Sequence, residues 1–511
     1  MRRPSLFVII AFTLVAAVYT GARLWHLTAT CLWFDEIFSV HAARYGWGRM
    51  ISFVAADVVH PPLFYALLKV WIGIGGESLL WLRLLPVLFS VAAIVPFLLL
   101  CRELRLDAAV AGLALLLMAV NGYLIKYAQE VRMYSLLLFL TLTSLWLFAK
   151  FLRVEEGRNR LLLMLSVVNL LLVYTHYYGW MVVAVELLYL LLRGRAYWRR
   201  FFISVVLIML CFSPWAYAVL SAERGQGLAQ NIGWASRPRL ADLAQLYVLL
   251  HQPFIYQQSS AERPFPPWGF AASLLLFGLP LLALLWQELK KRRPAEGAWL
   301  PADLTWLLWF SVFPVLIALV LSWVLPQSIW GTRHLIIMAA PYALLVSVAI
   351  NRLRPAVTKH IVMLVFCCWL LLAGAATQLR REGNYIWCAW GELAEQMPAG
   401  ESVKVYAFED LVAYHLWFAV GDHSKVVVIK GLPGLREDNA YFLPRAFDDI
   451  AVQAKPELSG EHIWLAFRDT ALDEGREPLK TAKAQGYEVR NVSSKQVGRE
   501  QAFLVEMGMR P

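Results

Sequence analysis

Two adjacent carboxylates, Asp35 and Glu36, are the first residues of this chain that could perform acid–base chemistry. They follow Trp33 and Phe34 and open the first polar stretch after a long apolar segment. A carboxylate pair just outside a membrane helix supplies a base for a substrate that the lipid delivers. The plain alternative is an interfacial pair that solubilises a helix end, and position alone favours neither interpretation.

A second polar group begins at His60, which is followed by two prolines and an apolar stretch to Ile74. That stretch is too short to span a bilayer as a helix. Because it carries Lys69 and because proline fixes its start, we predict an interfacial helix that lies in the membrane plane. Such a helix could cover a cavity that receives a lipid headgroup.

The segment from Tyr127 to Tyr134 combines an acid, a base and aromatic rings at the start of an apolar run. Glu130 and Arg132 are two residues apart, so they do not share one helix face and should meet different partners. We predict Tyr127, Glu130 and Arg132 as site residues. The alternative is an ordinary polar cluster at the membrane interface.

Two later turns add histidine and arginine. His176 and Tyr177 stand among aromatic residues suited to stacking on a sugar, although a lone histidine at a turn more often caps a helix. Arg333 and His334 precede another apolar run, and the planar guanidinium of arginine matches phosphate oxygens. The alternative for Arg333 is a long side chain that anchors a helix at the membrane surface.

Membrane helices must position these residues. The chain has 511 residues, of which 59% are hydrophobic and 16% are charged, and its apolar runs predict a polytopic α-helical membrane protein. Segments rich in lysine and arginine alternate with segments poor in them, which places the N-terminus inside and the C-terminus outside. We predict eleven spans, at residues 5–25, 81–101, 107–123, 133–151, 161–177, 179–193, 201–220, 269–289, 303–325, 334–350 and 360–379.

The end of the chain has a different character. Residues 380–511 contain 16 basic and 20 acidic residues, and we predict a small soluble α/β domain there, with a transmembrane catalytic domain at residues 1–379. Cys31 and Cys388 both fall on the predicted outer side, where a disulfide could join them. Predicted strands cover residues 403–408, 425–429 and 462–467, and predicted helices cover residues 411–420 and 470–485.

The sequence argues against several other classes. The net charge of +11 comes from the membrane part and its cytoplasmic turns, so it is an orientation signal and predicts no nucleic-acid partner. The sequence contains no P-loop, no dinucleotide-binding glycine pattern and no C-x-x-C spacing, which leaves ATP, NAD and zinc-ribbon chemistry unsupported.

The outer loop 221–268 is long enough to act as a mobile flap.

Several motifs together resemble bacterial members of the GT-C superfamily, above all the families of protein O-mannosyltransferases and lipid A aminoarabinose transferases. They follow one another on one predicted membrane face over about residues 1–350, and a soluble outer tail is also typical. The motifs are Trp33-Phe34-Asp35-Glu36, His60-Pro61-Pro62-Leu63-Phe64-Tyr65, Arg83-Leu84-Leu85-Pro86, Gln129-Glu130-Val131-Arg132-Met133-Tyr134, His176-Tyr177-Tyr178-Gly179 and Arg333-His334-Leu335.

The resemblance implies inverting transfer of a sugar from a polyprenyl-phosphate donor at the outer face of a bacterial inner membrane. The acceptor is left open among envelope glycolipids such as lipid A, other glycans and proteins. Asp35 is carried over as the general base, Glu36 tunes it or orients the acceptor, and Glu130 binds a sugar hydroxyl or a cationic group. The predicted substrate-binding and phosphate-binding residues are His60, Lys69, Tyr127, Arg132, His176, Tyr177, Arg333 and His334.

Cofactor use and two rival functions stay open from the sequence. His60 and His176 could hold a divalent metal instead of phosphate, and no other cofactor is predicted. Glu186 lies inside a predicted span, where a carboxylate is costly and often functional, so a lipid or solute transporter or flippase is the main alternative. A polysaccharide polymerase or ligase is a second alternative, suggested only by Arg237 and Arg239.

Overall fold

The structure is a computed structural model that divides into two compact units. Unit 1 comprises Met1–Leu27 and Val58–Arg380, and unit 2 comprises Thr28–Asp57 and Arg381–Pro511. Residues 28–57 therefore group with the C-terminal part of the chain, from which a cut at residue 380 separates them. The structure describes residues 5–154, 156–193, 196–222, 235–254, 271–290, 302–379, 386–398, 403–421, 424–432, 435, 443–498 and 500–510.

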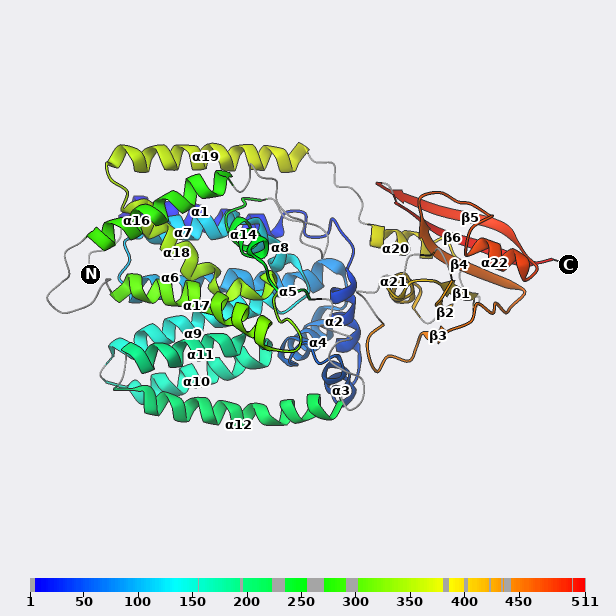
Figure 1. The fold of residues 1–511 in the computed structure, drawn as a ribbon, viewed down its shortest axis with the longest axis horizontal. Coiled ribbons are helices and arrows are strands. Elements are labelled where there is room, and N and C mark those ends of the chain that lie inside the picture. The colour runs from blue at the N-terminus through cyan, green and yellow to red at the C-terminus, as the bar shows by residue number, and fades with distance from the viewer. Residues whose placement is uncertain are drawn as a thin grey trace. The chain divides into compact units, whose positions relative to one another are not determined.

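Unit 1 is helical, and its long helices run side by side (Figure 1). Its helices are α1 (Leu6–Leu24), α4 (Leu63–Gly75), α5 (Leu79–Ala92), α6 (Ile94–Glu103), α7 (Ala108–Val120), α8 (Gly122–Gln129), α9 (Tyr134–Arg153), α10 (Arg158–Thr175), α11 (Gly179–Arg193), α12 (Trp198–Ala222), α14 (Leu240–Leu249), the π-helix η1 (Leu274–Gly278), α16 (Leu279–Lys290), α17 (Ala302–Val324), the 3₁₀ helix η2 (Thr332–Met338), α18 (Ala339–Asn351) and α19 (Ala356–Leu379).

Nine helical segments in the described part of the chain are long and apolar enough to cross a membrane. They coincide with nine of the eleven predicted spans. The remaining two predicted spans are the shorter helices α7 and α11, of 13 and 15 residues. The predicted class, a polytopic α-helical membrane protein, is confirmed. The predicted flap at 221–268 lies largely outside the described residues, which include α14 within it.

The helix breaks between α7 and α8, at Asn121. The side chain of Asn121 accepts the backbone N–H of Leu124 at 2.9 Å and so caps the start of α8. The buried guanidinium of Arg23 donates to the carbonyls of Met118 and Ala119 at the end of α7, at 3.2 and 3.3 Å. These bonds satisfy carbonyls that the end of a helix leaves without a helical partner.

Helix α4 is the short apolar helix that the sequence predicted after the proline pair. It packs on α5 through Trp71 and Trp81, whose indole N–H groups donate to each other's backbone carbonyls at 2.7 and 2.9 Å. The two rings stack with centroids 4.1 Å apart. A Cβ at Gly75 would overlap the Trp81 ring, so glycine is required for this close approach. The paired tryptophans fix the position of α4 on α5, and α4 carries Tyr65 and Lys69.

Unit 2 is built on a six-stranded sheet with the order β3-β2-β1-β4-β6-β5. The first four strands in that order are parallel, and β6 and β5 continue the sheet antiparallel (Figure 1). The strands are β1 (Val403–Ala407), β2 (Ser424–Ile429), β3 (Ala451–Gln453), β4 (His462–Asp469), β5 (Tyr487–Val497) and β6 (Glu500–Met509). The helices are α2 (Phe34–Arg44), α3 (Trp47–Asp57), η3 (Ile386–Cys388), α20 (Ala389–Ala394), α21 (Asp410–Val420) and α22 (Leu479–Ala484).

The predicted strands and the helix at 411–420 of this unit are confirmed, whereas the long helix predicted at 470–485 is wrong. Only Leu479–Ala484 is helical there, and Leu479 and Ala482 join the core beneath the sheet. The hairpin of β5 and β6 was missed, because β5 alternates half-buried and exposed polar residues and has no apolar run.

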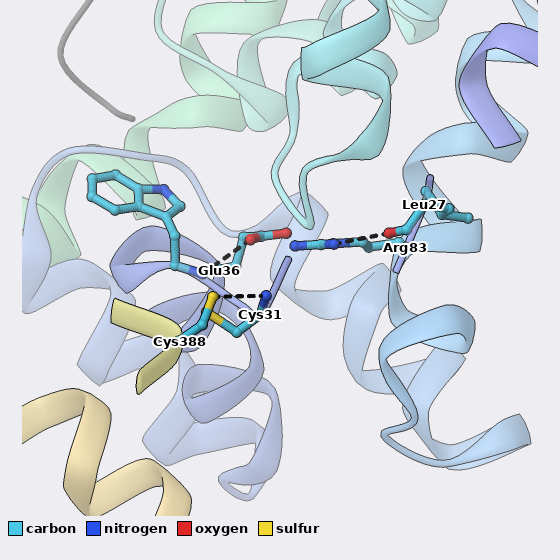
Figure 2. The surroundings of a disulfide bond; sticks show 6 residues. Leu27, Cys31, Glu36, Arg83 and Cys388 are labelled. Carbon is cyan, nitrogen blue, oxygen red and sulfur yellow. Dashed lines mark hydrogen bonds between the residues drawn. A yellow bond between two sulfur atoms is a disulfide. The ribbon is translucent and has the colours of Figure 1, made fainter. Parts of the chain in front are cut away.

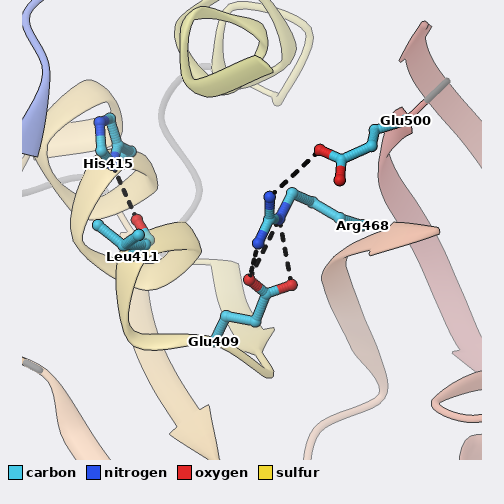
Figure 3. A network of polar contacts seen from close by, with 5 residues as sticks. All are labelled: Glu409, Leu411, His415, Arg468 and Glu500. Carbon is cyan, nitrogen blue, oxygen red and sulfur yellow. Dashed lines mark hydrogen bonds and ion pairs between the residues drawn. The ribbon is translucent and has the colours of Figure 1, made fainter. Parts of the chain in front are cut away.

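A largely buried network of ion pairs connects strands of the sheet to neighbouring helices (Figure 3). Arg468 on β4 donates through two nitrogens to Glu409, which precedes α21, and through a third to Glu500 on β6 at 3.4 Å. The guanidinium also lies 4.3 Å from the centre of the Trp387 ring. Glu409 and Arg468 are both largely buried, so removing either one would leave the other as an uncompensated buried charge. The network joins β4, β6, α21 and η3.

Candidate functional site

Three histidines from distant parts of unit 1 form one group, which we call the histidine cluster: His60, His176 and His334. The ring centroids of His176 and His334 are 4.6 Å apart, and the His60 ring lies 5.1 Å from the His176 ring. One ring nitrogen from each histidine lies within 4.8 Å of the other two. The sequence predicted each of them as a site residue without showing that they meet.

Local backbone features bring the three rings together. His60 stands directly before the prolines at which α4 begins, and His176 follows α10, donating its backbone N–H to the carbonyl of Leu172 at 3.2 Å. His334 lies on η2, where a Cβ at Gly331 would approach its Nδ1 to 2.6 Å. Glycine at 331 therefore leaves room for the third ring.

Arg132, in the connection between α8 and α9, reaches the same cluster. Its Nη2 donates to Nδ1 of His60 at 3.2 Å, and its Nη1 donates to the hydroxyl of Tyr65 at 3.3 Å. Only 3% of Arg132 is exposed. Tyr65 was missed as a site residue, although its position in the motif that begins at His60 could have indicated it.

Hydrogen-bond partners decide which ring nitrogen carries the proton in two of the histidines. Arginine can only donate, so Nδ1 of His60 accepts from Arg132 and the neutral ring carries its proton on Nε2. The backbone N–H of Tyr178 donates to Nδ1 of His176 at 3.0 Å, which again leaves the proton on Nε2. Both Nε2 atoms are buried without a hydrogen-bond partner among the described residues. They are N–H groups that can donate to a ligand.

Charge and burial keep these rings neutral. Burial lowers the pKa of His176, in the turn beyond the end of α10, to about 3, and the positive charges of Arg132 and Arg333 act in the same direction. Burial and Arg132 likewise hold the pKa of His60 well below its ordinary value of 6.5. Near pH 7 the site therefore combines neutral N–H donors with the positive charge of two arginines.

This donor set fits an anion better than a metal ion. A metal ligand must offer a nitrogen without a proton, which would put the proton of His60 and of His176 on Nδ1. That proton would face the Arg132 guanidinium in one ring and the Tyr178 N–H in the other, and two donors cannot bond each other. Only His334, whose two ring nitrogens have no partner among the described residues, is unconstrained. The arrangement thus argues against the metal that the sequence left open.

Two predicted aromatic site residues lie in different surroundings. Tyr127 is buried and packs edge-to-face on Tyr134, and the Tyr134 ring stacks on His334 at a centroid distance of 6.2 Å. Tyr177 instead contacts α12, where its hydroxyl accepts the indole N–H of Trp215 at 3.2 Å. Tyr127 therefore lies in the surroundings of the histidine cluster, whereas Tyr177 contacts Trp215 on α12.

The remaining charged candidates of unit 1 have different surroundings. The charge of Arg333 is near enough to lower the pKa of His176. Lys69 is half-buried on α4, one helical turn after Tyr65 and hence on the same face. Glu130 forms a loose ion pair with Lys126, at 3.9 Å between Nζ and Oε1.

The two acids of the first motif lie in unit 2, in the first turn of α2, and they differ from each other. Glu36 is 2% exposed, and its Oε2 accepts the backbone N–H of Trp33 at 3.0 Å, so its carboxylate caps the helix. Asp35 is half-buried, and its backbone carbonyl accepts the hydroxyl of Ser39 at 3.0 Å. The capping bond distinguishes Glu36 from Asp35, which stays the candidate for the base.

Glu186, the residue behind the transporter alternative, is part of a closed hydrogen-bond circuit. Its Oε2 accepts from the amide of Asn169 at 2.7 Å, and its Oε1 lies 2.7 Å from the hydroxyl of Ser144. The same hydroxyl lies 2.6 Å from Oδ1 of Asn169. Since Ser144 has one proton, it can donate to only one of these oxygens, and all three contacts are satisfied only if Glu186 is protonated and donates to Ser144.

Comparisons with known proteins identify the fold. No protein-family model and no curated protein matches the sequence. The crystal structure of ArnT from Cupriavidus metallidurans bound to undecaprenyl phosphate matches at 13% identity and a TM-score of 0.57, covering 98% of this chain and 98% of that chain. Apo ArnT from the same organism matches at 14% identity and a TM-score of 0.55, covering 98% and 97%. The archaeal oligosaccharyltransferase AglB from Archaeoglobus fulgidus, in complex with an inhibitory peptide and a dolichol-phosphate, matches at 14% and 0.48, covering 82% and 64%.

The likeness to ArnT extends over nearly the whole chain, including the C-terminal sheet unit. It shows that this chain has the fold of ArnT.

Proposed function

We propose that this protein is a glycosyltransferase that moves a sugar from a polyprenyl-phosphate donor to an acceptor at the outer face of a bacterial inner membrane. The observation that carries the proposal is the histidine cluster, where two buried N–H groups and two arginines surround a position suited to an anion. The fold shared with ArnT, which was crystallised with undecaprenyl phosphate, supports the same donor class.

The donor phosphate is proposed to bind at the histidine cluster. Nε2–H of His60 and of His176 would donate to phosphate oxygens, and the charges of Arg132 and Arg333 would stabilise the anion. A phosphate is already a good leaving group, so the site needs cations and donors for the departing oxygen but no strong acid. Lys69 and Tyr65 on α4 would extend this contact, and Tyr127 would support the ring of His334 through Tyr134.

Asp35 is the proposed general base. It takes the proton of an acceptor hydroxyl while the acceptor oxygen forms a bond to the anomeric carbon. The bond between that carbon and the phosphate oxygen breaks, and polyprenyl phosphate leaves with the electron pair. Attack on the face opposite the leaving group inverts the anomeric configuration. Glu36 holds the first turn of α2 for Asp35, and Glu130 is proposed to bind a sugar hydroxyl or a cationic acceptor group.

Three features support the outer face as the place of reaction. Sugar nucleotides stay in the cytoplasm, so transfer outside requires a donor linked to lipid. The distribution of lysine and arginine places the proposed site residues opposite the basic turns. Cys31 and Cys388 form a disulfide, which is typical of an oxidising compartment. The acceptor is proposed to be an envelope glycolipid such as lipid A, another glycan or a protein.

The transporter alternative loses its main support. A proton-coupled carboxylate must change its protonation during the cycle, whereas buried Glu186 has a structural explanation that needs no such change, because its oxygens pair with Ser144 and Asn169 and so join α9, α10 and α11. The polymerase or ligase alternative is also weakened. Arg237 stacks over the Trp323 ring at 5.6 Å, and the backbone N–H of Arg239 donates to Asp242 at the start of α14.

The test is transfer by the purified protein in lipid. A panel of polyprenyl-phosphate sugars is offered with an envelope-lipid extract, and products are read by mass spectrometry beside the Asp35→Asn variant. The proposal expects free polyprenyl phosphate and a new sugar-bearing product, both absent from the variant, which still binds donor. Consumption of donor by Asp35→Asn at the wild-type rate would refute the role of Asp35, and turnover of no donor by the wild type would refute the function.

A further inference from the structure

The helix that carries Asp35 belongs structurally to the soluble part of the chain. Although α2 follows the first membrane helix directly in the sequence, residues 28–57 form one compact unit with residues 381–511. Helix α2 packs on α21, which lies in the C-terminal region. At 11 residues it is too short to be a stable helix by itself, so its geometry depends on these contacts.

The first attachment is covalent and lies four residues before Asp35. Cys31 and Cys388 form a disulfide, and the backbone N–H of Cys31 donates to the Cys388 sulfur at 3.1 Å (Figure 2). The position of Cys388 is fixed by packing of the preceding residue. Trp387 lies under the Arg468 guanidinium and stacks on His415 with ring centroids 5.3 Å apart. The bond thus ties the segment that enters α2 to the packed part of unit 2.

The second attachment is polar and lies further along α2. His41 is 3% exposed, and its Nδ1 pairs with the hydroxyl of Tyr414 on α21 at 2.9 Å. Its Nε2 pairs with the hydroxyl of Tyr45 at 2.8 Å. The rings of Phe53 and Phe447 pack on His41 with centroids 5.0 and 4.7 Å away. Burial lowers the pKa of His41 to about 3, so this link stays neutral and intact over the physiological range.

We infer that Cys31, Cys388, His41 and Tyr414 are positioning residues for Asp35, the proposed base, and that the packed part of unit 2 holds the helix that carries it. The inference rests on the proposed function. Two attachments, one on each side of Asp35 along the chain, fix both the position and the rotation of the first turn of α2. The donor-phosphate site, by contrast, is built entirely within unit 1. Loosening α2 should therefore slow the chemical step without weakening donor binding.

The first test removes the disulfide in the full-length protein in lipid. Wild-type protein is compared with protein treated with a phosphine reductant and with the Cys31→Ser/Cys388→Ser double variant. Because small displacements of a catalytic group cost about 10- to 100-fold in rate, we expect kcat to fall on that order while the donor Kd is unchanged. Cys211→Ser, which removes a free cysteine of α12, is the control and should match the wild type.

The second test uses a matched pair of tyrosines. Tyr414→Phe removes the hydroxyl that His41 contacts, and Tyr487→Phe removes a partly buried hydroxyl on β5 that donates to Gly460 at 2.8 Å. Both variants keep the ring and lose one tyrosine hydrogen bond of unit 2, so the melting temperature of each should fall. Only Tyr414→Phe should lower kcat, by about three- to tenfold, with the donor Kd unchanged. An equal fall of kcat in both variants would overturn the inference.

A third readout does not depend on turnover. Hydrogen exchange of residues 34–44 should rise on reduction of the disulfide, while exchange of β4 and β6 stays as in the untreated protein. The inference would be overturned if reduction leaves the exchange of α2 or the kcat unchanged. It would also be overturned if the donor affinity weakens in step with kcat. If the wild type transfers no sugar, the proposed function fails, and the exchange of α2 alone decides whether the soluble unit holds this helix.

Discussion

Two of the buried polar clusters of unit 1 differ in one respect. In the circuit of Ser144, Asn169 and Glu186, every side-chain oxygen and nitrogen named above has a partner, and the circuit joins α9, α10 and α11. In the histidine cluster, Nε2 of His60, Nε2 of His176 and both ring nitrogens of His334 are buried without a partner among the described residues.

The difference separates a structural cluster from a binding site. An unmade hydrogen bond in a buried group costs free energy, so a protein retains it only where something else completes the bond. The closed circuit is complete in itself and stabilises helix packing. We propose that the open cluster gains its missing bonds from a ligand and that its arginines select an anion.

The largest effect should come from opening the closed circuit. Glu186→Leu leaves Ser144 and Asn169 buried without their partner and should destabilise the protein by about 2–5 kcal/mol. Glu186→Gln can both accept from Asn169 and donate to Ser144, like the protonated acid, and should cost less than about 1 kcal/mol. Thermal unfolding in detergent compares the two variants, and a severe loss in Glu186→Gln would contradict the protonated state.

The open cluster should respond in the opposite sense, with loss of binding and little loss of stability. Arg132→Gln removes a charged donor and should weaken binding of polyprenyl phosphate by about 10- to 100-fold, since a hydrogen bond to a charged group contributes about 1.5–3 kcal/mol. Arg153→Gln, which breaks the exposed ion pair of Arg153 with Asp303, is the control and should bind normally. Equal weakening in both variants would remove the special status of Arg132.

Acid should destabilise the ligand-free protein through the open cluster. The folded pKa of His176 is lowered to about 3, so an unfolded chain takes up a proton below pH 6.5 that the folded ring refuses. Stability is therefore full above pH 6.5 and falls as the pH drops toward 3, with about 2 kcal/mol lost at pH 5 from this residue. His176→Gln should show a shallower decline between pH 6.5 and 5 in unfolding experiments, and an identical slope would refute the assignment.

A smaller effect is expected where the backbone makes room for the third ring. Gly331→Ala places a Cβ about 2.6 Å from Nδ1 of His334, so the ring must move. Donor binding should weaken by about three- to tenfold, because one of several contacts is displaced rather than removed. Gly374→Ala on α19, where a Cβ would meet nothing within 4 Å, should leave binding unchanged.

Metal removal should have no effect. The tautomers of His60 and His176 present protons rather than lone pairs, so exhaustive treatment with a chelator should leave donor affinity and turnover unchanged. Loss of donor binding on chelation, restored by zinc or another divalent ion, would show that the cluster is a metal site after all.

Much of the fold and part of the site could be predicted from the sequence. Nine apolar runs predicted the positions of their helices well, because a helix that crosses a bilayer requires a long continuous apolar segment. The identities of His60, Arg132, His176 and His334 followed from motif positions. Their meeting did not, because it depends on packing between helices far apart in sequence. Tyr65 was overlooked for the same reason, as its hydroxyl matters only once Arg132 lies beside it.

The place of residues 28–57 was harder still to predict. Their sequence continues directly from a membrane helix, and only Cys31 and Cys388 hinted that they join the C-terminal unit. The separate roles of Asp35 and Glu36 required the capping hydrogen bond to Trp33, which adjacent carboxylates in a sequence cannot reveal. The β5–β6 hairpin was missed because strand pairing, rather than local apolar pattern, holds its polar residues in place.

The most direct test of the central claim compares two lipids that differ only in the phosphate. Binding of polyprenyl phosphate and of the uncharged polyprenol of the same chain length is measured on the full protein, and on the Arg132→Gln and Glu186→Gln variants. We expect the wild type and Glu186→Gln to prefer the phosphate by at least about tenfold, and we expect Arg132→Gln to lose this preference. Equal affinity of the wild type for both lipids, or loss of the preference in Glu186→Gln alone, would contradict the assignment of the open cluster as the phosphate site.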